Sequence, residues 1–222
     1  MNNILAFNAV IFDMDGLLLD TESTYIHAWR QALDHMNYDL HTAFEAEVCG
    51  LAYPAIAELL MQHYGSDFDL AGFAALSNDF WLQQAKLDGI AVKPGAPEVL
   101  QWLNAREVPY CLATNSPQAK AITCLEFAGL QDSFAVVLGR EHVTQPKPYP
   151  DIFLKAAEIL QCNINTCLVL EDSYPGILAA SRAGAQAIYI PSLPRNLAAA
   201  SLAHAEYPDL LQFLENLSTQ YP

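Results

Sequence analysis

The chain has 222 residues, a hydrophobic fraction of 53% and a formal net charge of −15, from 25 acidic and 10 basic residues. This length suits one large domain or a core with a smaller partner. The excess of acids argues against a nucleic-acid partner or an anionic membrane surface, because both are bound mainly through lysine and arginine. No stretch approaches the roughly 20 apolar residues that a membrane span needs.

The N-terminus and the cysteines favour a cytoplasmic protein. Met1 to Ile4 carry no basic residue ahead of the apolar ones, so we expect no signal peptide. The cysteines are odd in number and form no C-x-x-C pair, which favours reduced, buried thiols over a disulfide framework or a zinc site. They are Cys49, Cys111, Cys124, Cys162 and Cys167.

The first predicted strand covers residues 9–14. An uninterrupted apolar run, residues 9–12, suits a strand buried on both faces in the middle of a parallel sheet. Asp13 and Asp15 then mark its carboxyl end, where ligands bind in open α/β sheets, and Gly16 allows a sharp turn. Taken alone, the two acids are more typical of an ordinary turn.

The segment from residue 21 to about 91 shows helical periodicity and no convincing strand. Apolar side chains recur at helical spacing in residues 26–36, 56–63 and 73–87. Pro54 suits the first turn of a helix, and Gly65 and Gly72 are expected to interrupt the helices. We therefore predict an all-helical domain at residues 21–92.

Beyond a linker at residues 92–95, predicted helices and strands alternate. Strands are expected at residues 110–113, 135–138, 166–170 and 187–190. Helices are expected at residues 97–106, 119–127, 151–160, 177–183 and 208–217. Such alternation implies right-handed crossovers and a parallel sheet. The predicted fold is a doubly wound, Rossmann-like α/β core at residues 1–20 plus 93–222, into which the helical domain is inserted.

Polar side chains follow two further strands of this predicted core. Thr114 and Asn115 come after one, and Glu171 and Asp172 come after another. Each pair is also typical of a helix N-cap. Lys147 stands between them in a loop that prolines on both sides stiffen, although a single lysine is most often a solvated surface residue.

Together these groups suit phosphoryl transfer. A carboxylate can attack phosphorus and form an acyl phosphate, and a divalent cation and a lysine can neutralise the anions that meet there. Asp13, the carbonyl of Asp15 and Asp172 offer oxygens of the kind that Mg²⁺ prefers. A second acid can protonate the leaving alcohol and then activate water.

The motifs resemble those of the haloacid dehalogenase superfamily. Asp13-Met-Asp15-Gly with its tail to Glu22 is similar to the first motif, Thr114-Asn-Ser to the second, and Lys147-Pro-x-Pro-Asp to the third. Leu-Glu171-Asp172-Ser, with Gly176 and the small residues up to Gly184, is similar to the fourth. The helical insert resembles that superfamily's α-helical cap. The subgroup implied contains phosphoglycolate and sugar-phosphate phosphatases and β-phosphoglucomutase.

The resemblance implies a role for each residue. Asp13 would be the nucleophile and Asp15 the general acid/base. Phosphate would be held by Thr114, Asn115 and Lys147. Mg²⁺ would be bound by Asp13, Asp15 and Asp172, with Glu171 supporting the metal. The substrate would be a small phosphorylated metabolite, with neither nucleic acid nor membrane as partner, and we expect a monomer.

Several functions fit these motifs. A magnesium-dependent phosphatase is preferred over a phosphomutase, a haloacid dehalogenase and a phospho-ligand sensor. Dehalogenases of the superfamily lack the second aspartate, which Asp15 supplies here. A mutase needs cap cations to hold a second phosphate, yet residues 21–92 contain two basic residues, Arg30 and Lys86, against ten acids. Tyr53 also stands where the resembling mutase has an arginine.

The selectivity of such enzymes comes from the cap, which closes over the leaving group. Candidate contacts, each equally compatible with simple packing, are Glu22, His27, Gly50, Leu51, Tyr53 and Trp81.

Overall fold

The protein is described by a computed structural model covering residues 4–39, 53–192 and 194–221. By its internal contacts the chain divides into two compact units, Met1–Asp20 with Ala91–Pro222, and Thr21–Ile90. We refer to them as the core unit and the helical unit. Among the described residues, no helix has both the length and the apolar character that crossing a bilayer requires.

The core unit is built on a parallel sheet with the strand order β3-β2-β1-β4-β5-β6. Its strands are β1 (Ala9–Phe12), β2 (Tyr110–Ala113), β3 (Val137–Leu138), β4 (Cys167–Glu171), β5 (Gln186–Tyr189) and β6 (Ala205–Glu206). Every residue of β1 and of β4 is buried, as expected for central strands with both faces covered. The sheet confirms the predicted doubly wound α/β fold.

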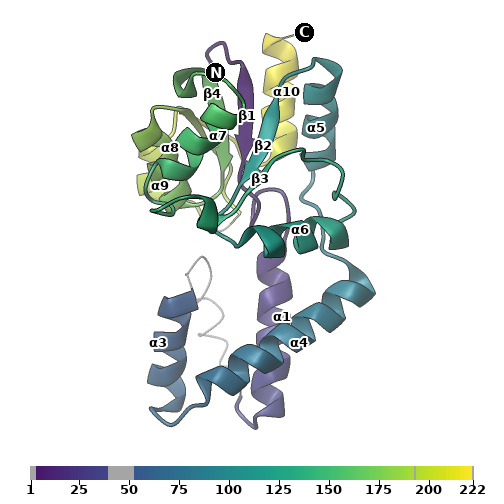
Figure 1. The fold of residues 1–222 in the computed structure, drawn as a ribbon, viewed down its shortest axis with the longest axis vertical. Helices are drawn as coiled ribbons and strands as arrows, with labels where there is room; N and C mark the ends of the chain where they lie inside the picture. Colours follow the sequence, from purple (N-terminus) through teal and green to yellow (C-terminus); the bar gives the residue numbers. More distant parts are fainter. Residues whose placement is uncertain (1–3, 40–52, 193, 222) are drawn as a thin grey trace. The chain divides into compact units, whose positions relative to one another are not determined.

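Helices cover both faces of this sheet (Figure 1). They are α5 (Ala96–Ala105), α6 (Gln118–Phe127), α7 (Asp151–Ile159), α8 (Tyr174–Ala183), α9 (Leu197–Leu202) and α10 (Leu210–Gln220). In Figure 1, α5 and α10 lie on one side of β1, and α7, α8 and α9 lie on the other. Small buried side chains of α8, including Ala179 and Ala180, let it pack against the strands in one apolar cluster with α7.

In the described part of the chain the predicted elements are present, but several of their ends differ, and some short elements, including the 3₁₀ helices η1 (Arg140–His142) and η2 (Ile164–Thr166), were not predicted. The strand predicted at residues 9–14 ends at Phe12, and the helix predicted from residue 177 begins at Tyr174. That earlier start follows from Ser173, whose hydroxyl caps the helix at the Gly176 N–H, and from a proline in its first turn. Helix α9 and strand β6 were not predicted, because six and two residues carry little periodicity.

The helical unit contains α1 (Thr21–His35), α3 (Tyr53–Tyr64) and α4 (Leu70–Asp88), and its described residues form no strand. Its apolar core includes Leu33, Leu60 and Phe73. Gly65, at φ +97°, follows the last residue of α3, as expected of a helix end. The predicted interruption at Gly72 is wrong: α4 starts before it, and Gly72 N–H donates to the capping carboxylate of Asp69 over 2.8 Å.

Candidate active site

Three neighbouring strands of the core unit deliver polar side chains to one edge of the sheet. Asp13 directly follows β1 and Thr114 follows β2, while Glu171 ends β4. Each of these residues is at most 6% exposed, so the sheet buries them although they are polar or charged. The carboxyl ends of adjacent parallel strands meet at one edge, which explains why residues so far apart in sequence converge here.

Lys147 lies at the centre of this group and is itself 7% exposed. Its ammonium donates to Asp13 Oδ1 over 2.5 Å, to Glu171 Oε1 over 2.6 Å and to the carbonyl of Ala113 over 2.9 Å. The ammonium also lies 5.0 Å from the centre of the Phe153 ring. All three of its donors therefore have an acceptor, which is the condition for burying a charge without a large cost.

Burial and the charge of the partner shift the pKa values of Lys147 and Asp13 in opposite directions. Burial lowers the pKa of the Lys147 ammonium, but the carboxylates of Asp13 and Glu171 outweigh it and raise that pKa above its usual value. Burial raises the pKa of Asp13, against the effect of Lys147, and the negative charges of Glu171 and Asp172 add to the rise. Lys147 thus stays protonated at neutral pH within a group that holds more carboxylates than cations.

The excess of carboxylates fits a bound divalent cation. Asp13, Glu171 and Asp172 each offer a carboxylate oxygen, and these oxygens lie within 4.8 Å of one another. One ammonium cannot neutralise three carboxylates, so a divalent cation would balance the charge that remains. An all-oxygen donor set is the kind that Mg²⁺ and Ca²⁺ take, rather than zinc.

Asp172 is packed tightly against the turn that follows β1. The hydroxyl of Ser192 donates to Asp172 Oδ2 over 2.5 Å. A Cβ atom at Gly16 would come within 2.2 Å of that same oxygen and 2.7 Å of Ser192 Oγ, and Gly16 has φ +81°. Only glycine therefore fits beside this carboxylate.

Glu171 is held equally closely by the start of α8. Its Oε2 accepts hydrogen bonds from the N–H and the hydroxyl of Ser173, over 3.1 and 2.9 Å. A Cβ atom at Gly176 would lie 1.8 Å from Glu171 Cδ. Its other oxygen, Oε1, accepts from Lys147, so both oxygens of the Glu171 carboxylate are fixed by hydrogen bonds. This suits a residue that orients its neighbours rather than one that moves.

Asp15 is oriented by hydroxyl groups from the loop after β2. Thr114 Oγ1 and Ser116 Oγ both donate to Asp15 Oδ2, over 3.2 and 2.9 Å. Thr114 Oγ1 also accepts from the Ser116 N–H over 3.0 Å, as in a local turn. The sequence prediction assigned no role to Ser116 or Ser192. Ser116 could have been found from its place in the second motif, whereas Ser192 stands in a loop without a recognisable pattern.

The side-chain amide of Asn115, a residue predicted to hold phosphate, contacts the loop that carries Lys147. Its side-chain Nδ2 donates to the Lys147 carbonyl over 3.1 Å, and its Oδ1 accepts from the Lys147 N–H over 2.9 Å. Both ends of the amide are therefore engaged with the backbone of the lysine loop.

The predicted contacts in the helical unit remain predictions. Glu22 is half-buried in the first turn of α1 and His27 is exposed, whereas Trp81 is buried and donates to Thr24 Oγ1 over 3.1 Å. Trp81 also stacks on Tyr25, so packing within the unit explains its position. Gly50, Leu51 and the side chain of Tyr53 lie outside the described part of the structure.

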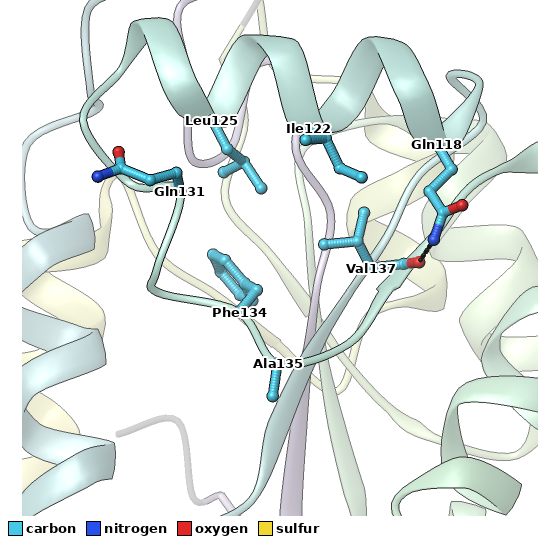
Figure 2. Close-up of a pocket in the computed structure, with 7 residues that line it drawn as sticks. All are labelled: Gln118, Ile122, Leu125, Gln131, Phe134, Ala135 and Val137. Atoms are coloured by element: carbon cyan, nitrogen blue, oxygen red, sulfur yellow. Dashed lines mark hydrogen bonds between the residues drawn. The ribbon is translucent and has the colours of Figure 1, made fainter.

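A separate pocket of about 220 Å³ lies beside the edge strand β3 (Figure 2). Ile122 and Leu125 of α6 point into it from one side, and Phe134 and Val137 face them from the other. At one end, Gln118 Nε2 donates to the carbonyl of Val137 over 3.0 Å. None of the predicted site residues lines this pocket.

Comparison with known proteins identifies the family. A family model described as haloacid dehalogenase-like hydrolase matches residues 7–184. The fructose-1-phosphate phosphatase YqaB of Escherichia coli is 33% identical over 184 residues, which cover 82% of this chain and 95% of that protein. A phosphorylated carbohydrates phosphatase of Thermotoga maritima is 30% identical over 82% of this chain and 83% of its own length.

Two further matches extend the comparison. The bifunctional riboflavin kinase/FMN phosphatase of Arabidopsis thaliana is 31% identical over 85% of this chain, and the match spans about half (49%) of that longer protein. A solved structure described as a putative β-phosphoglucomutase from Thermotoga maritima has a TM-score of 0.84 and 27% identity, covering 96% of this chain and 99% of the other. The resemblance inferred from the motifs and the predicted enzyme class are thereby confirmed: the chain belongs to the haloacid dehalogenase-like hydrolase family.

Proposed function

We propose that the protein is a magnesium-dependent phosphomonoester hydrolase that acts on a small phosphorylated metabolite through an aspartyl-phosphate on Asp13. The observation that supports this most is the buried group of Asp13, Glu171 and Lys147, beside Asp172. The ammonium of Lys147 lies among several carboxylates, so the site can bind a dianionic phosphate only if a divalent cation is also bound there. The residues present fit such an ion.

Asp13 is the proposed nucleophile. One oxygen of its carboxylate attacks phosphorus, the bond from phosphorus to the leaving oxygen breaks, and the phosphoryl group becomes attached to Asp13. The ammonium of Lys147 already donates to Asp13 Oδ1, and it can neutralise negative charge on both the carboxylate and an incoming phosphate oxygen. Bound at Asp13, Asp172 and the backbone carbonyl of Asp15, with Glu171 in support, Mg²⁺ would offset the repulsion between two anions.

Asp15 is the proposed general acid and base. It gives a proton to the leaving alkoxide as the first step proceeds, and it then takes a proton from the water that attacks the aspartyl-phosphate. The hydroxyls of Thr114 and Ser116 hold its carboxylate in place. Inorganic phosphate and the free alcohol are the products, and Asp13 is regenerated as the carboxylate.

The substrate is proposed to be a sugar phosphate or a similar small ester. Relatives named for fructose 1-phosphate, phosphorylated carbohydrates and glycerol 3-phosphate support this class. Relatives named for FMN and pseudouridine 5′-phosphate widen the set that needs testing.

A β-phosphoglucomutase-like phosphomutase is the second candidate, and the similarity to the solved Thermotoga structure favours it. Against it stands the charge of residues 21–92, which contain ten acids and only two basic residues. A mutase must bind two phosphates, and the second one needs cations outside the Asp13 site.

A panel of phosphorylated sugars, polyols and nucleosides, assayed at fixed magnesium and ranked by kcat/KM, tests the proposal. It should include β-glucose 1-phosphate with catalytic β-glucose 1,6-bisphosphate, with free phosphate and glucose 6-phosphate followed together. Phosphate release from one substrate class supports a hydrolase. Isomerisation faster than phosphate release would establish the mutase, and no turnover of any ester would reject both.

A further inference from the structure

The loop that carries Lys147 is fixed through its backbone by side chains from two other elements. Residues 146–150 join η1 (Arg140–His142) and the segment after it to α7, and the sequence Pro-Lys-Pro-Tyr-Pro leaves few backbone donors there. One of them, the Tyr149 N–H, donates to the Pro146 carbonyl over 3.0 Å and closes the loop on itself. The remaining contacts come from outside the loop.

Asn115 fixes the loop at Lys147 itself. Its amide donates to the Lys147 carbonyl over 3.1 Å and accepts from the Lys147 N–H over 2.9 Å. A side-chain amide that pairs with both backbone groups of one residue restrains that residue in position and orientation, as a strand partner would. Asn115 follows directly on Thr114, which orients Asp15, so one short segment holds groups on both sides of the site.

Arg182 fixes the same loop one residue further on. Its Nη1, from the last turn of α8, donates to the Pro148 carbonyl over 2.8 Å. Its guanidinium also lies 5.9 Å from the centre of the Tyr149 ring. Proline has no backbone N–H, so Pro148 can form a backbone hydrogen bond only through its carbonyl. The guanidinium of Arg182 supplies the donor for that carbonyl.

We propose that Asn115 and Arg182 are positioning residues for Lys147: they hold the backbone at residues 147–148 so that the ammonium reaches Asp13, Glu171 and the Ala113 carbonyl together. The lysine side chain has several rotatable bonds, and its ammonium meets three acceptors within 2.9 Å only if the start of that side chain is fixed. A shift of about 1 Å is enough to cost a reaction of this kind roughly 10²-fold.

This assigns Asn115 to the lysine loop rather than to the phosphate, and it assigns a function to Arg182, which lies outside the predicted site. The expected effect of these two residues on turnover rests on the proposed phosphatase function. Their restraint of the loop does not, because the hydrogen bonds exist whatever the reaction is. Two measurements therefore separate the two questions.

The first measurement is hydrogen exchange of the peptide that contains residues 146–150, in the full-length protein. Asn115→Ala and Arg182→Gln should both raise the exchange rate there by about fivefold, the effect of losing roughly 1 kcal/mol of hydrogen bonding. Lys155→Gln is the matched control: it also removes one positive charge from the core unit, but among the described residues the hydrogen-bond partner of Lys155 is Glu158, over 2.8 Å. Unchanged exchange in both variants would overturn the proposal.

The second measurement is kcat/KM for p-nitrophenyl phosphate in a double-mutant cycle with Lys147→Met. We expect Asn115→Ala to lower it by roughly 10- to 100-fold and Arg182→Gln by a few-fold, with Lys155→Gln unchanged. In the Lys147→Met background, assayed at high enzyme concentration, Asn115→Ala should cost less than about twofold.

Three outcomes are decisive. An equal loss from Asn115→Ala in both backgrounds would mean that the amide contacts substrate directly, which contradicts the proposal. Partial recovery in Arg182→Lys, which can still donate to the Pro148 carbonyl, supports it even if Lys147→Met does not fold. A wild-type protein without phosphatase activity but with faster loop exchange in the variants would reject the proposed function and leave the loop restraint standing.

Discussion

Lys147 Nζ lies 2.5 Å from Asp13 Oδ1, although 134 residues separate the two in the sequence. The contact joins the loop before α7 to the end of the central strand β1. It makes the site electrostatically interdependent, because the same ammonium also pairs with Glu171 over 2.6 Å. Changing any of the three therefore alters the charge balance of the other two.

Asp13→Asn should lower turnover by at least about 10³-fold and leave the fold intact. The amide is almost the same size as the carboxylate but cannot attack phosphorus, and Lys147 keeps Glu171 as a charged partner. Steady-state kinetics with circular dichroism and thermal unfolding checks this. A folded Asn variant with full activity would show that Asp13 is not the nucleophile.

Asp15→Asn should slow the hydrolysis of alkyl phosphates by roughly 10²–10⁴-fold, since the variant cannot protonate the leaving alcohol. The first step with p-nitrophenyl phosphate should suffer much less, because p-nitrophenolate leaves without a proton. Burst kinetics with both esters distinguishes these steps. An equal loss with both would point to a structural effect, through the hydrogen bonds from Thr114 and Ser116, rather than to acid catalysis.

The general arrangement of the chain was predictable, while the contacts that refine the site were not. The carboxyl end of a buried apolar strand is readable from the run before Asp13, and the parallel fold then brings the other strand ends to the same edge. Hydrogen bonds between loops have no such signature. Ser192 reaches Asp172 from a loop after β5, and Asn115 turns its amide to Lys147.

Short elements and a capped glycine mark the limits of pattern recognition in the same way. Strand β6 owes its existence to pairing with β5, where Ile188 lies opposite Ala205, rather than to its own two residues. Gly72 was expected to interrupt a helix, yet the capping carboxylate of Asp69 starts α4 ahead of it. In both cases a tertiary or capping contact overrides the local preference of the residue.

Removal of magnesium with a chelator should stop phosphate release, and returning it should restore the activity. Calcium should inhibit, because it takes more oxygen ligands at longer distances and can draw both oxygens of the nucleophile into its coordination shell. Isothermal titration with each cation, alongside assays, measures binding independently of turnover. Activity that survives exhaustive chelation would contradict the metal-assisted mechanism.

Gly176→Ala should lower both the stability and the activity of the enzyme, even though alanine normally favours a helix by about 1 kcal/mol over glycine. The new methyl group would lie 1.8 Å from Glu171 Cδ, so Glu171 must move away from Lys147. We expect a loss of about 1–3 kcal/mol in the free energy of unfolding from overpacking, and roughly 10²-fold in kcat/KM from displaced side chains.

Gly129→Ala is the matched control, because a Cβ atom there meets nothing within 4 Å. Because position 129 has φ +71°, the alanine variant should lose about 1–2 kcal/mol of stability, but its kcat/KM should be unchanged. Denaturant unfolding and kinetics on both variants provide the comparison. Similar kinetics in the two variants would mean that Gly176 does not protect the position of Glu171.

Cys111 should make the stability of the protein fall in alkaline solution. Burial raises the pKa of its thiol to about 12 from an ordinary value of 9.0, and the nearby Cys167 adds to the rise. Below pH 9 the thiol is protonated in both the folded and the unfolded chain, so its ionisation does not yet lower the free energy of unfolding. Between pH 9 and 12 only the unfolded chain loses the proton readily, and the free energy of unfolding should fall by about 1.4 kcal/mol per pH unit.

Urea unfolding of wild-type protein and Cys111→Ala at pH 8 and pH 10 isolates this contribution, since the tyrosines and lysines titrate alike in both proteins. The variant starts less stable, because it has lost a buried side chain, but it should lose about 1.4 kcal/mol less than wild type between the two pH values. An equal loss in both proteins would show that the folded state does not protect this thiol from ionisation.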